Sequence, residues 1–274
     1  MIDPYRLVAP ACVSFSGGRT SAYLLRKVLD AHGGTLPPGV HVLFANTGKE
    51  HPGTLDFVRD CGERWDVQIV WLEYDGRDGK GGRLSYREVT HATASRAGEP
   101  FAALIASKQA LPNWGARWCT QELKVARLRA WMRVRGYESW TDAVGLRADE
   151  PRRVARIKGD HTQEVTRVTP LADAGVTVED VARFWAAQPF DLAVPYGAGN
   201  CDLCFMKAAR VLREQVRERP DLTTWWSDRE AETGRVWNVR FTYAQLRARA
   251  LMPVVRSSQL DLFDESQPDC ACTD

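Results

Sequence analysis

One short segment combines glycines and hydroxyl side chains at a spacing that suits phosphate binding. Residues 14–21 read Ser-Phe-Ser-Gly-Gly-Arg-Thr-Ser, between an apolar run and a helix-like segment. Glycines permit backbone angles and close approaches that side chains block, and a helix N-terminus offers free N–H groups. The segment lacks the Gly-Lys-Ser/Thr of a Walker loop. The plainer alternative is a Ser/Gly turn that starts a helix. We predict a nucleotide-phosphate cradle made by Ser14, Ser16, Gly17, Gly18, Arg19, Thr20 and Ser21.

A second group of reactive residues is a set of cysteines. Of seven in the chain, Cys201 and Cys204 form a Cys-x-x-Cys pair, and Cys119 lies far upstream at the start of a helix-like segment. In a cytosolic protein, such spacing indicates metal, cluster or redox chemistry rather than disulfides. An Fe–S cluster takes four thiolates, structural zinc four nitrogen or sulfur ligands. A redox pair without metal is the third alternative. Cys12 and Cys61 lie in apolar patterns and are predicted to be packing thiols.

The elements that must position these groups alternate between strand and helix. Strand patterns at 12–15, 40–45 and 67–72 alternate with helix patterns at 22–32 and 52–65. This rhythm predicts an α/β fold, a doubly wound, mostly parallel, Rossmann-like sheet with helices on both faces. Ligands of such sheets bind beyond the carboxyl ends of the strands. Candidate cofactor-binding residues at that edge, after further strands, are Asn46, Thr47, Gly48 and Gly145.

The second half of the chain is predicted to be mainly helical. Helix patterns cover 101–111, 120–134 and 178–187, with strands at 140–144 and 165–168; residues 207–251 are helical with an interruption at 233–239, and 76–82 form an exposed loop. We predict a nucleotide-binding domain with the cysteine site at 1–206, a helical C-terminal extension at 207–255, and a flexible tail at 256–274.

Composition narrows the classes of function. The chain has 274 residues, 44% hydrophobic and 26% charged, which is ordinary for a globular protein. No apolar run approaches the ~20 residues that span a bilayer, and the N-terminus lacks signal-peptide features. We therefore expect a cytoplasmic protein without a membrane partner. A net charge of +2 does not by itself indicate nucleic acid, and basic clusters at 147–158 and 210–219 are typical of solvated faces.

The glycine loop resembles the Ser-Gly-Gly-x-Thr/Asp-Ser loop of the PP-loop ATP pyrophosphatase superfamily. Those enzymes have an adenine nucleotide alpha-hydrolase-like fold, cleave ATP between the α- and β-phosphates and adenylylate a substrate. The Cys119 helix start, residues 145–153 (Gly-Leu-Arg-Ala-Asp-Glu-Pro-Arg-Arg) and the Cys-x-x-Cys pair resemble the phosphoadenosine phosphosulfate (PAPS) reductase family. Residues 44–50 (Phe-Ala-Asn-Thr-Gly-Lys-Glu) resemble its second-strand motif. The resemblance spans roughly residues 8–210.

The resemblance implies a [4Fe–4S] cluster, with zinc as the alternative. The adenylyl-sulfate reductase branch holds its cluster with a Cys-Cys pair and a later Cys-x-x-Cys. Here Trp118 replaces the first cysteine of the pair. Either a tail cysteine is the fourth ligand or one iron stays open. The predicted ligands are Cys119, Cys201, Cys204 and Cys272, with Cys270 as the alternative to Cys272.

The resemblance also implies ATP and Mg²⁺. Sulfonucleotide reductases keep a degraded loop, whereas this loop is complete, and a complete loop implies a pyrophosphate to hold. We predict an enzyme that forms AMP and pyrophosphate and transfers sulfur to an adenylylated acceptor. Sulfur would come from the cluster or from a partner such as a cysteine desulfurase. Candidate catalytic cations are Arg147, Lys124, Arg152 and Arg153; Glu50, Asp149 and Glu150 are candidate metal ligands.

The acceptor stays open. Superfamily relatives with clusters thiolate tRNA bases, and another branch inserts sulfur into the DNA backbone, so nucleic acid is a candidate acceptor. One alternative is a PAPS or adenylyl-sulfate reductase that releases sulfite. Another is a non-catalytic nucleotide-binding accessory subunit. The sequence also leaves open whether the protein forms a homodimer.

Overall fold

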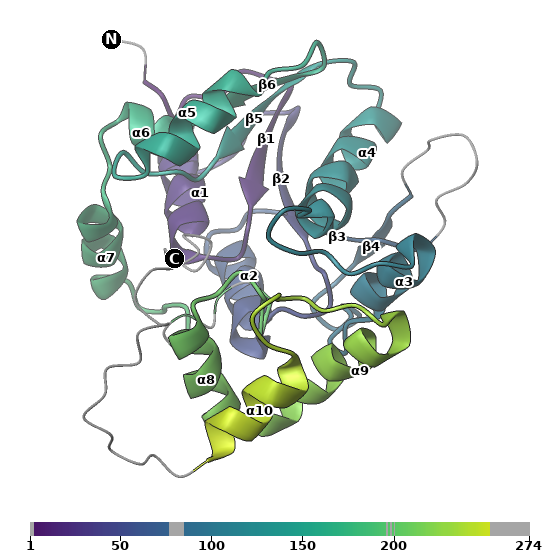
Figure 1. The fold of residues 1–274 in the computed structure, drawn as a ribbon. Coiled ribbons are helices and arrows are strands. Elements are labelled where there is room, and N and C mark those ends of the chain that lie inside the picture. Colours follow the sequence, from purple (N-terminus) through teal and green to yellow (C-terminus); the bar gives the residue numbers. More distant parts are fainter. Residues whose placement is uncertain (1–2, 77–84, 196, 198, 200, 253–274) are drawn as a thin grey trace.

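A six-stranded sheet forms the centre of the computed structural model, which describes residues 3–76, 85–195, 197, 199 and 201–252 (Figure 1). Its strand order is β4-β3-β2-β1-β5-β6. Every neighbouring pair is parallel except β3 and β4. This confirms the predicted α/β class with a mostly parallel sheet. The strands are β1 (Ala11–Phe15), β2 (Val40–Ala45), β3 (Ile69–Glu73), β4 (Arg87–Val89), β5 (Trp140–Val144) and β6 (Val165–Val168).

The order of the strands reverses at β1. Strands β2 and β3 follow on one side of it, and β5 and β6 lie on the other. In open α/β sheets, ligands bind outside the carboxyl ends of the strands at such a switch point. The loop after β1 is the glycine loop, and the loop after β5 begins at Gly145. The sheet therefore brings two of the predicted segments to the edge where the general rule expects a ligand.

Helices cover both faces of the sheet. The larger core joins β1 and β2 to α1 (Arg19–Ala31), α2 (Pro52–Arg64) and α7 (Val178–Ala186). The opposite face packs against α4 (Ala126–Val134) through Trp131 and Met132. This is the doubly wound arrangement. The remaining helices are α3 (Glu99–Lys108), a π-helix (Thr120–Val125), α5 (Pro151–Gly159), α6 (Pro170–Asp173), α8 (Ala209–Glu218), a 3₁₀ turn (Pro220–Leu222), α9 (Thr223–Thr233) and α10 (Tyr243–Leu251).

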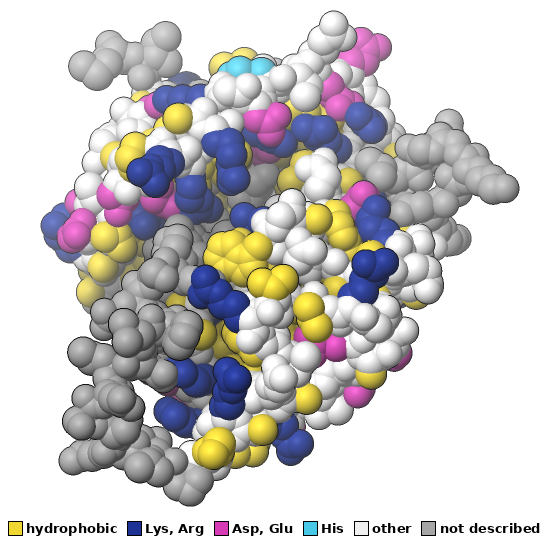
Figure 2. All heavy atoms as spheres, viewed as in Figure 1, with side chains coloured by type: hydrophobic (Ala, Val, Ile, Leu, Met, Phe, Trp, Pro, Cys, Tyr) yellow, Lys and Arg dark blue, Asp and Glu magenta, His cyan; other side chains and the backbone are white. Residues whose placement is uncertain are grey.

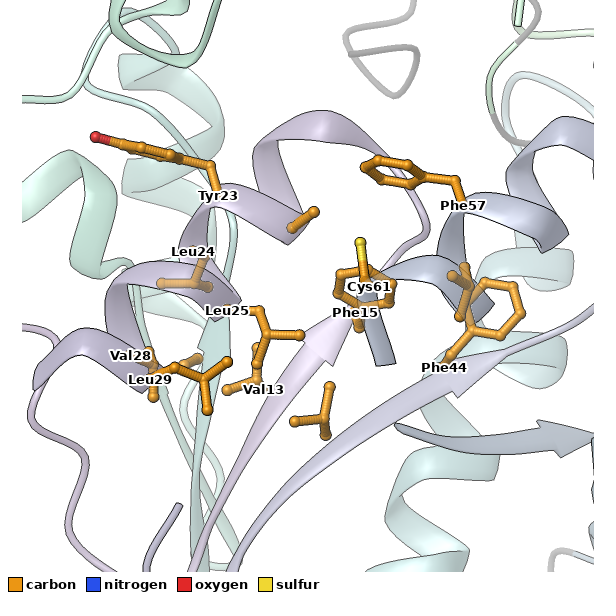
Figure 3. Close-up of a cluster of buried hydrophobic side chains, with 14 of the residues drawn as sticks. Val13, Phe15, Tyr23, Leu24, Leu25, Val28, Leu29, Phe44, Phe57 and Cys61 are labelled. Atoms are coloured by element: carbon orange, nitrogen blue, oxygen red, sulfur yellow. The ribbon is translucent and has the colours of Figure 1, made fainter. Parts of the chain in front are cut away.

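Side chains alternate between the two faces of strand β1, so this strand contributes to the hydrophobic cores on both sides of the sheet. Val13 and Phe15 face α1 and α2, as Figure 3 shows, whereas Cys12 lies in the core on the other face. Cys61 comes from α2 into the same cluster as Val13 and Phe15 (Figure 3). Burial raises the pKa of both cysteines. Both are packing thiols, as predicted.

Several boundaries differ from the sequence expectation. Helix α1 begins at Arg19 rather than at residue 22, because Gly18 already has the extended conformation of an N-cap. The third strand covers 69–73 instead of 67–72. Strand β4 and helix α5 were not expected: β4 has only three residues, and the basic residues of α5 concealed the helix-start signal of Pro151 at its first turn.

Helices α8, α9 and α10 form a layer below the sheet in the view of Figure 1. Trp226, Trp237 and Tyr243 share a buried cluster with Phe101 of α3. The predicted interruption is confirmed, because α9 ends at Thr233 and α10 begins at Tyr243. A second break, after α8, was not predicted. The layer therefore packs against the main domain through one shared apolar cluster.

No helix in the described part of the chain is long and apolar enough to cross a membrane. The predicted tail at 256–274 lies outside the described residues, and with it Cys270 and Cys272. The same holds for residues 77–82 of the predicted exposed loop.

Candidate functional site

The glycine loop is held closely against α2. Gly17 has φ +79°, a conformation that L side chains rarely adopt, and a Cβ there would lie 2.8 Å from Thr54 Cγ2. A Cβ at Gly17 would also lie 3.1 Å from Val58 Cγ2. Both the backbone and the packing therefore require glycine at this position.

The loop presents backbone N–H groups at the start of α1. The first helical hydrogen bond runs from the Ala22 N–H to the Gly18 carbonyl, at 3.0 Å. The N–H groups of residues 19–21 thus lie outside the helical ladder. Ser21 Oγ accepts the Ser16 N–H at 3.1 Å and donates to the Gly18 carbonyl at 2.9 Å. Ser21 therefore shapes the loop, while its neighbours leave N–H groups of the kind that can bind an anion.

Arg147 lies at the same place. Its side chain is 6% exposed, and its Nη1 donates to Thr20 Oγ1 at 3.2 Å. Its Nε donates to Asp149 Oδ1 at 3.0 Å. A Cβ at Gly145 would lie 3.0 Å from Ser21 Cα, so the glycine lets the loop after β5 approach α1. The switch point thus joins a buried guanidinium to a hydroxyl of the glycine loop.

The other predicted cations and hydroxyls differ in their surroundings. Arg153 forms an ion pair with Glu150, beside Arg147. Arg152 is exposed on α5. Arg19 forms a bidentate pair with Asp191, with both distances at 2.7 Å. The Ser14 hydroxyl donates at 2.6 Å to the largely buried Asp142 of the neighbouring strand β5.

The segment after β2 is fixed by buried hydrogen bonds. Asn46 Nδ2 donates to Glu73 Oε1 at 2.6 Å and to the Ser95 carbonyl at 2.9 Å. Asn46 Oδ1 accepts the Gly48 N–H at 3.1 Å. Gly48 has φ +80°, and a Cβ there would lie 2.9 Å from Pro100 Cδ. Hydrogen bonds and close packing therefore fix the position of the candidate cofactor-binding residues Asn46 and Gly48.

The same segment reaches the cysteines. The Thr47 N–H and hydroxyl donate to the Glu50 carboxylate, each at 2.9 Å. Glu50 forms an antiparallel bridge with Cys201, and Thr47 Oγ1 lies 3.5 Å from Cys201 Sγ. Lys124 Nζ lies 3.8 Å from Glu50 Oε1. One short segment thus links the carboxyl edge of the sheet to the thiols.

The three described candidate ligands lie near one another. Burial, with a smaller contribution from neighbouring Cys204, raises the pKa of Cys119 to about 11. Burial also raises the pKa of Cys201, with smaller contributions from Glu50 and Cys204. Lys124 opposes both shifts. In the described ranges, no group of three or more His, Cys, Asp or Glu side chains is arranged to hold a metal ion.

Asp202, between the two cysteines of the pair, was missed by sequence reasoning. Its Oδ2 lies 2.7 Å from Lys49 Nζ, and these side chains are only 10% and 7% exposed. Its Oδ1 accepts the indole N–H of Trp226 at 2.8 Å. The only sequence signal was a carboxylate within a Cys-x-x-Cys pair, since Lys49 is distant in sequence. The Lys49–Asp202 ion pair anchors the loop that carries Cys201 and Cys204, here called the thiol loop, to the segment after β2.

Comparison with known proteins gives one curated relative and distant structural neighbours. No family model matches the chain. Over 202 residues the chain is 34% identical to the uncharacterized nin region protein ORF290 of Escherichia phage lambda. That match covers 72% of this chain and 66% of the relative, so the chain spans just under two thirds of the relative's length.

Two solved structures are similar at low identity. One is the PAPS reductase from Candida auris in a phosphate complex, at 16% identity and a TM-score of 0.40, covering 67% of this chain and 76% of that one. The other is the U34-tRNA thiolase NcsA from Methanococcus maripaludis with its [4Fe-4S] cluster. It has 13% identity and a TM-score of 0.35, covering 89% of this chain and 72% of that one.

Fold and loop together define the class of this protein. The sheet is doubly wound, and the glycine loop lies at its switch point, where the order of the strands reverses. This is the fold that the resemblance to the PP-loop superfamily and the PAPS reductase family implies.

Proposed function

We propose that this chain is an ATP-dependent, AMP- and pyrophosphate-forming enzyme that transfers sulfur to an adenylylated acceptor. The observation that carries the proposal is the contact between Arg147 and Thr20 at the switch point. A buried guanidinium beside the free amides of a helix N-terminus is a site for a polyphosphate. Arg147 is poised to stabilise charge on a departing pyrophosphate.

In the proposed reaction an acceptor oxygen attacks the α-phosphorus of ATP. The new P–O bond forms as the bond to the β-phosphate bridge breaks, and pyrophosphate leaves. Loop amides and Arg147 meet the charge that develops on the leaving group. Mg²⁺ would arrive with ATP, because the substrate phosphates supply much of its coordination. A sulfur nucleophile then displaces AMP from the acceptor.

The thiols match an Fe–S cluster in donor type. Thiolates are the usual ligands of Fe–S clusters, and Cys119, Cys201 and Cys204 all contact one apolar cluster of side chains beside the nucleotide edge. We propose these three as ligands, with Cys272 or Cys270 as the fourth or with one iron left open. When bound, such a cluster supplies an iron that can hold sulfide or a thiol sulfur. Zinc is the alternative.

The acceptor is proposed to be a nucleic acid. In the view of Figure 2, Lys and Arg side chains lie over α5 and α8, on either side of the region between the sheet and the C-terminal helices. Cationic side chains on both sides of a site favour a polyanionic acceptor. A cysteine desulfurase is the proposed kind of sulfur donor.

The test uses anaerobically purified full-length protein. Iron, zinc and acid-labile sulfide per chain are measured together with binding of ATP and of adenylyl sulfate. We expect about four iron and four sulfide per chain and tighter binding of ATP. Arg147→Met should weaken ATP binding at least ~10-fold and leave iron unchanged, whereas Cys204→Ala should do the reverse. Arg183→Met, an exposed change on α7, is the matched control.

Other results would point to the alternatives. Preferential binding of adenylyl sulfate with release of sulfite would identify a sulfonucleotide reductase. ATP binding without ATP–pyrophosphate exchange, even with tRNA or DNA added, would favour an accessory subunit. Iron that persists in a Cys270→Ser/Cys272→Ser variant would exclude a tail ligand.

A further inference from the structure

Strand β3 has an unpaired edge at its beginning. The short strand β4 pairs only with residues 71–73 of β3, because the chain turns at Thr90. The Asn46 N–H donates to the Leu72 carbonyl at 2.9 Å, so the backbone groups of Leu72 face the β2 side. Backbone groups alternate in direction along a strand, and those of Ile69 therefore face the other side, beyond the end of β4. Nothing in the described part of the chain pairs with Ile69 there, which leaves an edge that a further strand can use.

A hollow lies beside this edge on each face of the sheet. Helices α2 and α4 cover the two opposite faces (Figure 1). On the α2 face, a hollow of about 870 Å³ is lined by α2, the start of β3 and the residues that follow β4. On the α4 face, a hollow of about 390 Å³ is lined by α4, the start of β2 and the loop before it. The linings share Asp66, Val67, Gln68, Val70 and Glu88, so the two hollows meet at the edge of β3.

Apolar side chains of β3 lie in both hollows. Ile69 belongs to the core on the α2 face, and Val70 belongs with Trp131 to the core on the α4 face. Successive side chains of a strand point to opposite faces. An extended segment added at this edge would therefore place its side chains in one hollow and then in the other. In such strand addition, main-chain hydrogen bonds provide affinity and pockets for alternate side chains provide selectivity.

Acidic groups outnumber basic ones around the two hollows. The cations have carboxylate partners: Arg135 pairs with Glu88, Arg59 with Asp56 and Asp60, and His91 with Asp56. Arg96 donates to the His91 carbonyl at 2.7 Å and adds one positive charge there. Burial and Arg135 lower the pKa of His41, which keeps its ring neutral. Glu63 and Asp66 are exposed and form no ion pair within the described residues. This balance of charge favours a cationic partner.

We propose that this edge binds an extended segment of another protein, which adds as a strand beside the start of β3. The segment has apolar side chains for the two hollows and Lys or Arg side chains for Glu63 and Asp66. A second copy of this chain does not suit the edge, because a symmetric contact brings the same acidic patch against itself. A nucleic acid does not suit it either, since its phosphates would meet carboxylates.

The proposed docking edge lies far from the glycine loop along the strands. It is at the beginning of β3, whereas the glycine loop follows the end of β1, and β1, β2 and β3 are parallel. A partner at this edge would therefore leave the opposite end of the sheet open. The proposal goes beyond the ATP chemistry and does not depend on it.

Calorimetric titration of the full chain tests the proposal. The probe is the peptide acetyl-Lys-Val-Ile-Val-Ile-Lys-amide, compared with the same peptide carrying Glu in place of Lys and with its fully N-methylated form. We expect the probe to bind at least ~10-fold more tightly than either comparison peptide, because one lacks the charge and the other the backbone donors. At saturating probe, hydrogen exchange of the Ile69 amide should slow at least ~10-fold.

A double variant tests the role of the two carboxylates. Glu63→Gln/Asp66→Asn should raise the Kd of the probe about 3–10-fold, as expected for two exposed ion pairs. Asparagine tolerates the positive φ of +46° at residue 66. The matched control is Glu218→Gln/Asp228→Asn, which removes two exposed carboxylates from α8 and α9 and should leave Kd unchanged.

Several results would overturn the proposal. They are no binding of the probe at millimolar concentration, equal binding of the N-methylated peptide, an unchanged Kd in Glu63→Gln/Asp66→Asn, or unchanged exchange at Ile69. Displacement of the probe by an oligonucleotide would assign the face to nucleic acid instead, and displacement by self-association of the chain would assign it to a second copy. ATP binding is measured in the same variants and should be unchanged, so a failure of the proposed ATP chemistry is distinguishable from a failure of this edge.

Discussion

Two glycines share one backbone conformation but lie in different surroundings. Gly17 has φ +79° and Gly136 has φ +85°. A Cβ at Gly17 would meet Thr54 Cγ2 at 2.8 Å, whereas a Cβ at Gly136 would meet nothing within 4 Å. At the residue scale, the glycine loop is thus defined by close packing as well as by backbone freedom.

Replacing each glycine by alanine separates these two effects. Gly136→Ala should lower the free energy of unfolding by about 1–2 kcal/mol through backbone strain alone. Gly17→Ala should lower it further, because α2 must shift, and should also weaken ATP binding. Urea denaturation and calorimetry with ATP make the comparison. Equal losses of stability and unchanged ATP binding would show that the contact with α2 does not shape the loop.

Asp142 gives a pH test at the same scale. Burial raises its pKa above the ordinary value of 3.8, despite the hydrogen bond from Ser14. The folded state then holds this proton more tightly than the unfolded chain, so stability falls as pH rises from about 3.8 to the raised pKa. Asp142→Asn cannot titrate. Across that window the variant should therefore gain stability relative to the parent chain.

Asp180 serves as the control, because its pKa is shifted in the opposite direction. Hydrogen bonds from Thr177 and Arg183 lower the pKa of Asp180. Its stabilisation is present above the unfolded pKa and is lost as pH falls, so Asp180→Asn should lose relative stability as pH rises. Urea denaturation between about pH 2 and pH 8 measures both slopes, because the window for Asp180 lies mostly below its unfolded pKa of 3.8. Parallel slopes for the two variants would contradict the assigned burial of Asp142.

At the element scale, two loops act as one unit. The loop after β2 and the Cys-x-x-Cys loop meet through the Glu50–Cys201 bridge and the Lys49–Asp202 pair. Lys49 Nζ also lies 4.9 Å from the Trp225 ring centroid. A displacement of either loop would therefore strain the other.

A double-mutant cycle measures this link. Asp202→Asn leaves a buried ammonium group without its carboxylate and should cost about 3–5 kcal/mol of unfolding free energy. Lys49→Met should cost a similar amount, and the double variant should recover much of the loss. The matched control is Arg219→Gln, which breaks an exposed pair with Asp221 and should cost at most ~1 kcal/mol. Additive losses in the cycle would mean that the pair does not couple the loops.

At the scale of the whole molecule, the C-terminal helices are joined to the sheet domain by a common core. Trp226 and Tyr243 stack with ring centroids 5.1 Å apart, and Trp226 contacts Asp202 of the thiol loop. Phe101 of α3 packs on the same tryptophan. The predicted division between residues 1–206 and 207–255 stays a prediction, but the described side chains on both sides of it share one cluster.

Periodicity and motif spacing in the sequence determined the fold class, the location of the glycine loop and the packing role of two cysteines. Strand–helix alternation with a Ser-Gly-Gly turn suffices for a parallel sheet and a glycine turn at the start of a helix, because both depend on local patterns. The packing role of Cys12 and Cys61 was predictable for the same reason. The structure confirms these features.

Tertiary structure alone decided which of the candidate side chains meet. Ser14 bonds to Asp142 and Arg19 to Asp191, because strand neighbours and a distant loop supply those partners. Asp202 meets Lys49 for a similar reason. Such contacts join residues far apart in the chain, and no local pattern encodes them. The sequence therefore determines which chemical groups are present at the ligand edge, and long-range packing decides which of them act together.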